Sequence, residues 1–403
     1  MQNGLELVVI GGGIVGLATA YSLQAAGVRR LVVVEAESEV GAHQTGHNSG
    51  VIHSGLYYRP GSLKARNCVE GRAMMVRFCE EQGIAHEVCG KLVVATTEAE
   101  VEALKGLQVR GAENGLEGIA WLSGDEMREI EPHVAGLAGL RVPQTGIVKF
   151  GEVARALARL IVEGGGEVRC GTRVEKVDVQ ADGVVVSSGA GEIKARGLIN
   201  CAGLHSDRIA RMCGVDPGVM IIPFRGEYYE LVESRRSLVR HLIYPVPDPR
   251  FPFLGVHFTR MIGGGVEAGP NAVLAWSRHG YRHRDVSLRD LKDMAGYRGF
   301  WNMGRAYWRT GLGEFTRSLS KTAFARALGK LVPEIRADDL IPGGAGVRAQ
   351  AVGRDGRLLD DFHVVPAPRM VHVLNAPSPA ATSSLSIGRK VAEIAKEAMG
   401  WPG

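Results

Sequence analysis

The first 35 residues constrain the fold more than any other part of the sequence. A short apolar run, Leu7–Ile10, is followed by three glycines with the spacing G-x-G-x-x-G, between residues 11 and 16. Apolar side chains then recur at helical spacing, and a second apolar run, Leu31–Val34, ends at Glu35. Strand, glycine-rich turn, helix and strand in this order make a βαβ unit, whose turn accepts the pyrophosphate of a dinucleotide. We therefore expect a Rossmann-like domain in this part of the chain.

Each glycine of this motif has its own physical role. Gly11 permits the tight turn, Gly13 lets a pyrophosphate approach the backbone, and Gly16 lets the helix pack on the strand. Glu35 lies 19 residues beyond Gly16, where a carboxylate accepts hydrogen bonds from ribose hydroxyls and repels a 2′-phosphate. The spacing alone leaves NAD and FAD as alternatives.

Composition excludes several other classes of protein. Glycine accounts for 55 of 403 residues, but the glycines follow no fixed period, which excludes collagen-like and disordered chains. No run of 18 apolar residues occurs, so we expect neither a transmembrane helix nor a signal peptide. The six cysteines show no metal-site spacing. The expectation is a cytoplasmic protein with reduced thiols.

Patterns along the chain predict two domains built from interleaved segments. Patterns of alternating strands and helices recur at residues 1–85, 150–215 and 340–403, which we expect to form the nucleotide-binding domain. Residues 86–149 and 216–275 alternate more and hold most of the prolines, which predicts an antiparallel sheet, and residues 284–330 have the pattern of helices. We therefore expect residues 86–149 and 216–339 to form the substrate-binding domain. The expected fold class is therefore α/β, with an α+β second domain.

The loop after the second strand narrows the choice of cofactor. Gly41–Tyr58 is dense in small and hydrogen-bonding side chains, which suits a loop that leads from the nucleotide to a redox ring. Over essentially its whole length the chain resembles the glycine oxidase and D-amino-acid oxidase group of flavoproteins, and more narrowly the L-2-hydroxyglutarate oxidases or dehydrogenases. The most specific stretches are Gln44–Lys64, Pro223–Tyr229, Ile243–Pro249 and Ala345–Gln350.

The resemblance implies that the cofactor is FAD. It places Val174 at the adenine, Ala202 and Gly203 near the pyrophosphate, and the start of the last helix at the pyrimidine edge of the flavin. Plain helix capping by Thr382 or Ser383 is the alternative role for that helix start. The cofactor-binding residues are expected to be Gly11, Gly13, Ile14, Val15, Gly16, Glu35, Ala36, Thr45, His47, Asn48, Ser49, Val174, Ala202, Gly203, Gly346, Arg348, Ala381, Thr382 and Ser383. His47 occupies a place where some amine-oxidising relatives link the flavin covalently; free FAD is expected here.

The resemblance also implies that L-2-hydroxyglutarate is oxidised to 2-oxoglutarate, with hydride transfer to the flavin N5 atom. A base must take the hydroxyl proton, and histidine suits that role. His53 is favoured because its setting, Ile-His-Ser-Gly-Leu, is similar to Ile-His-Gly-Gly-Leu in flavin-dependent glycerol-3-phosphate dehydrogenases. A structural role in the flavin loop is the alternative for His53, and His257 is the competing base or substrate donor. No metal site is expected.

Arginines are the expected anchors for the substrate. Arg348 resembles the arginine that grips the substrate carboxylate across the wider oxidase group, and a planar guanidinium suits a carboxylate. Arg225 is expected to hold a second carboxylate, assisted by Tyr228 and Tyr244, with a salt bridge as the alternative role. Two such anchors would select a 2-hydroxy dicarboxylate.

The electron acceptor is expected to be oxygen or a quinone-linked respiratory acceptor. The net charge is +5, but residues 278–330 alone carry 12 Lys and Arg against 4 Asp and Glu, which does not favour nucleic-acid binding by the whole chain. Trp301, Trp308 and Phe315 accompany these arginines, so the segment is expected to be a solvated helical face or a peripheral membrane patch. The rival functions are an amino-acid or amine oxidase and a non-catalytic flavin-binding subunit.

Overall fold

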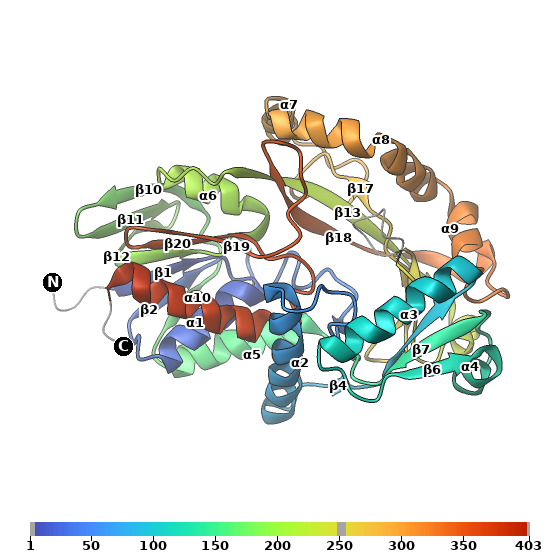
Figure 1. Ribbon diagram of the computed structural model, residues 1–403. Helices are drawn as coiled ribbons and strands as arrows, with labels where there is room; N and C mark the ends of the chain where they lie inside the picture. Colours follow the sequence, from blue (N-terminus) through green and yellow to red (C-terminus); the bar gives the residue numbers. More distant parts are fainter. Residues whose placement is uncertain (1–4, 248–254, 401–403) are drawn as a thin grey trace.

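Two large sheets make up the framework of the computed structural model, which describes residues 5–247 and 255–400 (Figure 1). Asp248 and Pro249, at the end of one stretch that carries the resemblance, lie outside the described residues. One sheet has eight strands, the other has nine, and a small three-stranded sheet accompanies them.

The eight-stranded sheet has the strand order β10-β11-β12-β1-β2-β9, and β20, paired with β19, also lies along β12. The pairs of β1 with β2 and β12, of β2 with β9 and of β12 with β20 are parallel, whereas β10, β11 and the first half of β12 are antiparallel. Leu7–Ile10 and Leu31–Val34 are buried on both faces, as parallel strands under two layers require. The strands are β1 (Leu5–Ile10), β2 (Leu31–Val34), β9 (Glu167–Arg169), β10 (Val174–Gln180), β11 (Gly183–Ser188), β12 (Gly191–Asn200), β19 (His363–Ala367) and β20 (Met370–Asn375).

Helices α1 (Ile14–Ala25), α5 (Phe150–Glu163) and α10 (Ser384–Met399) cover one face of this sheet, with α2 (Leu63–Gln82) beside them (Figure 1). Gly388 lets α10 approach α1, because a Cβ at this position would lie 2.5 Å from the carbonyl of Ala18. Helix α6 (Ser206–Met212) packs on the opposite face. The covering helices come from three separated stretches of chain, and they fix the glycine turn that precedes α1.

The nine-stranded sheet has the order β17-β13-β16-β15-β14-β5-β7-β6, and β18 pairs with β13. All its pairs are antiparallel except that of β14 with β5. Its strands are β5 (Lys91–Ala95), β6 (Ala120–Ser123), β7 (Ala138–Val142), β13 (Val219–Leu231), β14 (Leu242–Pro245), β15 (His257–Arg260), β16 (Val266–Gly269), β17 (Val273–Leu274) and β18 (Leu340–Gly353).

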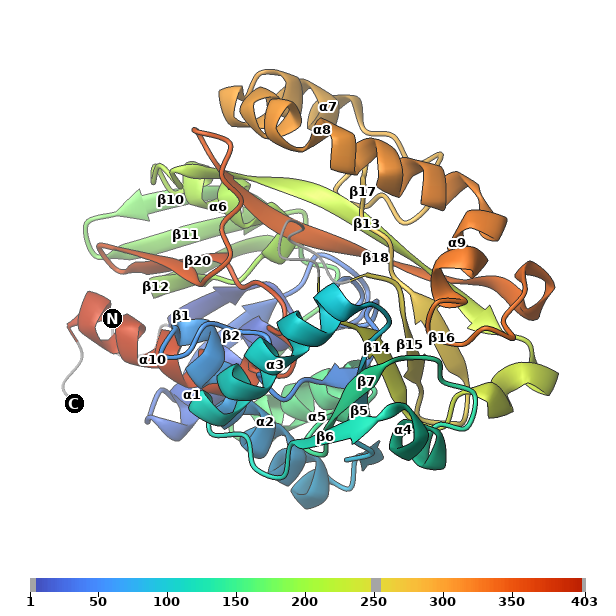
Figure 2. The same cartoon turned by 45° about the vertical axis from the view of Figure 1, so that its right-hand side comes forward.

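Five helices accompany this second sheet. Figure 2 shows α7 (Leu288–Ala295), α8 (Arg298–Leu319) and α9 (Lys321–Leu328) along the side formed by β13 and β18. Helices α3 (Glu98–Glu113) and α4 (Gly124–Ile130) pack near β5 and β7. The small sheet and three short 3-10 turns complete the chain: β3 (Val51–Ile52), β4 (His86–Glu87), β8 (Gly146–Val148), η1 (Gly203–His205), η2 (Glu233–Leu238) and η3 (Ala337–Asp339).

The predicted fold class, an α/β domain with a second, mainly antiparallel sheet, is confirmed. One element lies elsewhere than expected. Strand β18 falls within residues 340–403, yet it pairs along β13 of the nine-stranded sheet, with Arg348 opposite Phe224. Its glycine-rich sequence carries no periodic signal that would name a partner strand more than 100 residues away.

Among the described helices, none is both long enough and apolar enough to cross a lipid bilayer.

Candidate active site

A cavity of about 1560 Å³ is lined by residues from both sheets. The glycine turn after β1 and Glu35 after β2 form part of its wall, and His53 and Arg348 form another part. Pockets for one drug-sized ligand measure roughly 300–1,000 Å³, so this cavity is large enough for a dinucleotide together with a substrate.

The glycine turn has the geometry that the motif requires. Gly11 adopts a φ of +110°, and a Cβ there would collide with the backbone carbonyl of Cys201. A Cβ at Gly16 would collide with the carbonyl of Gly11, so this glycine allows α1 to start close to β1. Gly13 lines the cavity, and the nearest atom to a Cβ there would be Thr45 Oγ1 at 3.5 Å. The backbone at Gly13 is therefore open to a ligand.

The first turn of α1 faces the cavity without a side-chain cap. Gly13 is its N-cap residue, and within the described part of the chain only the amide of Ile14 in this turn donates to a side chain, Thr45 Oγ1 at 3.0 Å. Free amides and the positive end of the helix dipole favour a phosphate here. The carboxylate of Glu35 accepts from the amides of Gly12 at 2.7 Å and Glu37 at 2.9 Å. These bonds fix its position at the cavity wall, where it can accept from ribose hydroxyls.

The start of α10 provides a second helix terminus at the cavity. Its N-cap residue, Ser383, makes no side-chain cap bond. The Thr382 hydroxyl instead donates to the carbonyl of Val51 at 3.2 Å and accepts from the amide of His53 at 3.1 Å. The capping alternative for these residues is thus not what the structure shows: Thr382 ties the loop that carries His53 to the last helix.

Two histidines line another part of the cavity. Burial lowers the pKa of His53 to about 3, and the nearby charges of Lys91 and Arg348 add to the effect. Burial also lowers the pKa of His257 to about 3, again with Arg348 and Lys91 as contributors. Both imidazoles are therefore neutral near pH 7, which is the form that accepts a proton.

The two imidazoles differ in how they are held. His257 Nδ1 lies 2.8 Å from the carbonyl of Gly255 and must donate to it, which leaves Nε2 unprotonated. Its ring stacks on Tyr244 with centroids 3.8 Å apart. His53 is the more exposed of the two, and its Nδ1 has no hydrogen-bond partner among the described residues. Both geometries leave a ring nitrogen for a ligand.

The comparison with known families decides the cofactor. Residues 6–394 match the family described as FAD dependent oxidoreductase. The chain belongs to this family. FAD is accordingly its cofactor, and the uncapped α1, the open backbone at Gly13 and the Glu35 carboxylate suit the nucleotide part of FAD.

Relatives and solved structures agree with this assignment. An L-2-hydroxyglutarate dehydrogenase of Indibacter alkaliphilus is 53% identical over 97% of this chain and 98% of that protein. The mitochondrial L-2-hydroxyglutarate dehydrogenase of Homo sapiens is 41% identical over 97% and 88% of the two chains. An L-alpha-glycerophosphate oxidase from Mycoplasma pneumoniae with FAD bound superposes with a TM-score of 0.79 at 22% identity, covering 97% of this chain and 94% of that one.

Most of the residues expected to bind FAD line the cavity. They come from β1, α1, β2, the 41–50 loop, β10, η1, β18 and the start of α10, and they are Gly11, Gly13, Ile14, Val15, Glu35, Ala36, Thr45, His47, Asn48, Ser49, Val174, Ala202, Gly203, Gly346, Arg348, Ala381 and Thr382. Gly16 and Ser383 lie behind the wall, Gly16 as a packing position and Ser383 as a buried N-cap.

Of the expected substrate residues, Tyr228, Tyr244 and Arg348 line the cavity and Arg225 does not. The Arg225 guanidinium is buried against Glu227, 3.1 Å from Nε, and against His283, 2.7 Å from one terminal nitrogen. Glu227 lies two residues from Arg225 on β13, whereas His283 lies 58 residues away, a contact that no local sequence pattern indicates. The salt-bridge role weighed for Arg225 is the one that the structure shows.

Sequence reasoning missed several charged and phenolic groups at the substrate side. Tyr57, Tyr58 and Lys64 line the cavity, and Lys91 lies directly behind Tyr57. Lys91 opens an otherwise apolar strand, Lys-Leu-Val-Val-Ala, in which all five residues are buried. A lysine within such an apolar strand is the sequence feature that could have identified Lys91 as a candidate functional residue.

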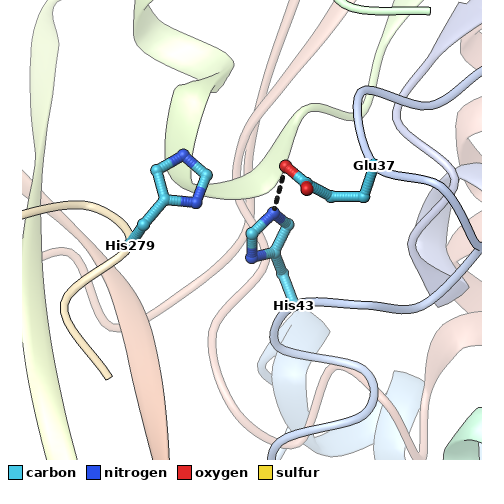
Figure 3. Close-up of side chains that lie close together, drawn as sticks. All are labelled: Glu37, His43 and His279. Carbon is cyan, nitrogen blue, oxygen red and sulfur yellow. Dashed lines mark hydrogen bonds and ion pairs between the residues drawn. The ribbon is translucent and has the colours of Figure 1, made fainter. Parts of the chain in front are cut away.

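Three potential metal ligands also meet at the cavity: Glu37, His43 and His279, whose ligand atoms lie within 4.8 Å of one another (Figure 3). His43 Nε2 contacts Glu37 at 3.2 Å, and Arg173 contacts the same carboxylate oxygen at 2.9 Å. His279 is 3.0 Å from a nitrogen of His205. Each of the three groups therefore has a protein partner, and an arginine already occupies the carboxylate.

Proposed function

We propose that the protein oxidises L-2-hydroxyglutarate to 2-oxoglutarate with FAD as the oxidant. The observation that carries this proposal is the 53% identity, over nearly the full length of both chains, with an L-2-hydroxyglutarate dehydrogenase. The site supports it independently, because an arginine and two neutral imidazoles line one region of the cavity. These are the groups needed to hold a carboxylate and to accept a hydroxyl proton.

Proton transfer in this proposal begins with His53. The substrate hydroxyl donates to the imidazole, and the proton moves to it as the C2–H bond breaks. The amides at the start of α1 and the Glu35 carboxylate would hold the nucleotide part of FAD, and the flavin would supply the two-electron oxidant for C2. A pKa near 3 makes a weak base, but a dianionic substrate opposes the charges of Lys91 and Arg348 and thereby raises the pKa of His53 toward the working pH. The substrate thus helps to activate its own base.

One observation favours His257 as a second candidate for the base. Its bond to the Gly255 carbonyl fixes the tautomer whose Nε2 accepts a proton, and such an orienting partner is typical of catalytic histidines. His53 lacks an orienting partner for its ring among the described residues.

Arg348 positions the substrate in this proposal. Its guanidinium binds the carboxylate next to C2 and fixes which hydrogen is transferred. Tyr228 and Tyr244 line the same region, and burial raises the pKa of each phenol, that of Tyr228 to about 12. Both hydroxyls therefore remain protonated and able to donate.

The reaction is tested by identifying the product. The holoenzyme with an artificial acceptor should convert L-2-hydroxyglutarate to 2-oxoglutarate, detected by mass spectrometry, and should release no ammonia from amino acids. Ammonia from an amino acid at a comparable rate would establish the rival amine or amino-acid oxidase. Flavin that is reduced only by a partner protein would establish the flavin-binding subunit.

We propose further that electrons pass to a membrane quinone. Trp301, Trp308 and Phe315 recur every seventh residue along α8, so they share one stripe, and all three are more than half exposed. Exposed arginines, among them Arg298 and Arg305, accompany the stripe. Aromatic side chains beside basic ones suit the interface of an anionic bilayer.

Vesicle sedimentation tests this patch. The double variant Trp301→Ser/Trp308→Ser should lose cosedimentation with anionic vesicles, whereas Val179→Ser, an equally exposed apolar side chain on β10, should retain it. Equal cosedimentation of the wild-type protein and both variants would contradict the proposed membrane patch.

A further inference from the structure

A buried lysine stands behind the substrate region of the cavity. Lys91, the first residue of β5, is 2% exposed. Its nitrogen lies 4.3 Å from the centroid of the Tyr57 ring and 4.9 Å from that of Tyr244, and no carboxylate pairs with it among the described residues. Burying an ammonium without a counterion is costly, so a protein that keeps one has a use for its charge.

The Tyr57 ring connects this charge to the cavity. Tyr57 lines the cavity, whereas Lys91 does not. The Tyr57 hydroxyl is buried and has no hydrogen-bond partner among the described residues. An ammonium over the face of a phenol draws electron density from the ring, which strengthens the O–H group as a donor. A buried donor without a partner costs free energy unless a ligand supplies the acceptor.

The charges of Lys91 and Arg348 both lie near the two histidines. Tyr244, beneath Lys91, stacks on His257, and Arg348 reaches the same pair of imidazoles from β18. The charges of both cations lower the pKa of both His53 and His257. Two positive groups, Lys91 behind Tyr57 and Arg348 in the cavity wall, thus act on the groups proposed to react with the hydroxyl.

We propose that Tyr57, supported by Lys91, binds the second carboxylate of a dicarboxylate substrate, while Arg348 binds the first. Tyr57 makes the contact, and Lys91 is a positioning residue that supplies the balancing charge through the ring. The inference rests on the proposed oxidation of a 2-hydroxy dicarboxylate and names the group that selects it. It fills the place expected for Arg225, whose guanidinium is engaged by Glu227 and His283.

Binding of unreactive acids to the holoenzyme tests the subsite without turnover. Glutarate carries two carboxylates and pentanoate one, and each is titrated while the flavin absorption spectrum is followed. The wild-type protein should bind glutarate more tightly. Tyr57→Phe and Lys91→Met should each weaken glutarate binding about 10- to 100-fold and leave pentanoate binding unchanged.

Two further variants separate the proposed role from a structural one. Lys91→Arg keeps the charge and should recover most of the affinity for glutarate. The control variant Lys105→Met removes a lysine on α3 whose side chain is 58% exposed, and it should change the binding of neither acid. If Lys91→Met fails to fold, Tyr57→Phe and Lys91→Arg still carry the test.

The subsite would be overturned if the variants bound glutarate and pentanoate equally more weakly, or if Tyr57→Phe bound glutarate as tightly as wild type does. It would also be overturned if the wild-type protein showed no preference for glutarate over pentanoate. A different result would separate the two proposals. If the preference for glutarate depended on Tyr57 but L-2-hydroxyglutarate did not reduce the flavin, the proposed oxidation would be refuted and the subsite would stand.

Discussion

Arg348, which lines the cavity, is the residue proposed to orient the substrate. Replacing it with lysine keeps the positive charge but removes the two-pronged contact with the carboxylate. We expect Arg348→Lys to raise KM for L-2-hydroxyglutarate about 10- to 100-fold, measured by steady-state kinetics with FAD content matched to wild type. An unchanged KM would remove Arg348 from the substrate site.

The two imidazoles are distinguished by their single variants. His53→Ala should lower kcat about 10²- to 10⁴-fold while FAD stays bound, because the proposed proton acceptor is lost. The matched variant His257→Ala should cost less, since it removes a neighbour of the reaction and not the acceptor. The reverse order of the two losses would transfer the role of base to His257.

The pH dependence of ligand binding reports on Lys91. Burial lowers the pKa of Lys91 to about 7. The other titratable groups around it do not titrate near pH 7. The pKa values of His53 and His257 are lowered, and those of Tyr57, Tyr244 and Cys68 are raised. A dianion prefers the protonated lysine, so glutarate affinity should be highest below pH 7 and should fall as the pH rises through that value.

Lys91→Arg should remove this fall, because a guanidinium stays charged throughout the range. A fall of the same size in Lys91→Arg would assign the pH dependence to another group, such as Lys64, whose pKa is also lowered by burial.

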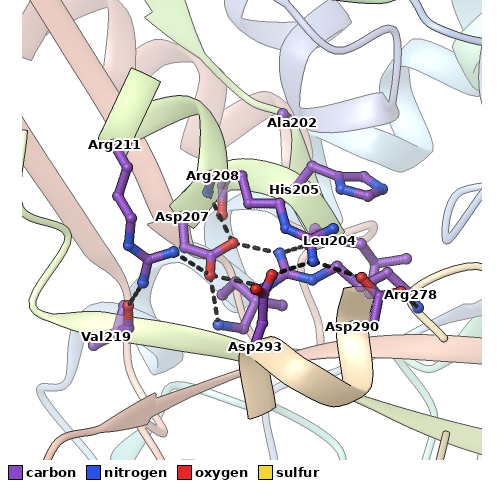
Figure 4. A network of polar contacts seen from close by, with 12 residues as sticks. Ala202, Leu204, His205, Asp207, Arg208, Arg211, Val219, Arg278, Asp290 and Asp293 are labelled. Atoms are coloured by element: carbon purple, nitrogen blue, oxygen red, sulfur yellow. Dashed lines mark hydrogen bonds and ion pairs between the residues drawn. The ribbon is translucent and has the colours of Figure 1, made fainter. Parts of the chain in front are cut away.

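At the scale of elements, a buried ion network joins α6 to the segment before α7 (Figure 4). Arg278 is 2% exposed and pairs with both oxygens of Asp207. Its backbone amide donates to Asp290 at 2.8 Å, and Arg208 also contacts Asp290 at 2.6 Å. Burial alone would raise the pKa of Asp207, but the hydrogen bonds and charge of Arg278 outweigh it and lower that pKa. The network holds the segment that brings His279 to the cavity.

Asp207→Asn should therefore destabilise the protein by about 3–5 kcal/mol, because it leaves the Arg278 charge buried and unpaired. Urea unfolding of the holoenzyme measures the loss. The matched variant Asp178→Asn breaks an exposed pair with Lys176 and should cost less than about 1 kcal/mol. Similar losses for the two variants would show that the buried network contributes no more than a surface pair.

Elements with local signals could be predicted from the sequence, and long-range pairings could not. The expected turn at Gly11 and the helix after it are present because strand, glycine spacing and helical periodicity all lie within one short stretch. The pairing of β18 with β13 and the contact of Arg225 with His283 depend instead on segments that are distant in the sequence. The charged residue in the apolar strand of Lys91 was a local signal, but the Tyr57 and Tyr244 rings that contact it come from other segments.

The whole molecule brings two sheets together around one cavity, whose wall includes residues from both sheets. The parallel sheet supplies the glycine turn and Glu35, and the mainly antiparallel sheet supplies Arg348, Tyr244 and His257. In the proposed reaction, a dicarboxylate held by the second sheet delivers its electrons to the FAD held by the first.

Anaerobic titration of the yellow holoenzyme with each enantiomer of 2-hydroxyglutarate tests this reaction most directly. We expect L-2-hydroxyglutarate to bleach the flavin absorption stoichiometrically and to yield one 2-oxoglutarate per flavin, whereas the D enantiomer should leave the spectrum unchanged. A flavin that stays oxidised with the L enantiomer, or that is bleached by an amino acid instead, would contradict the proposed reaction.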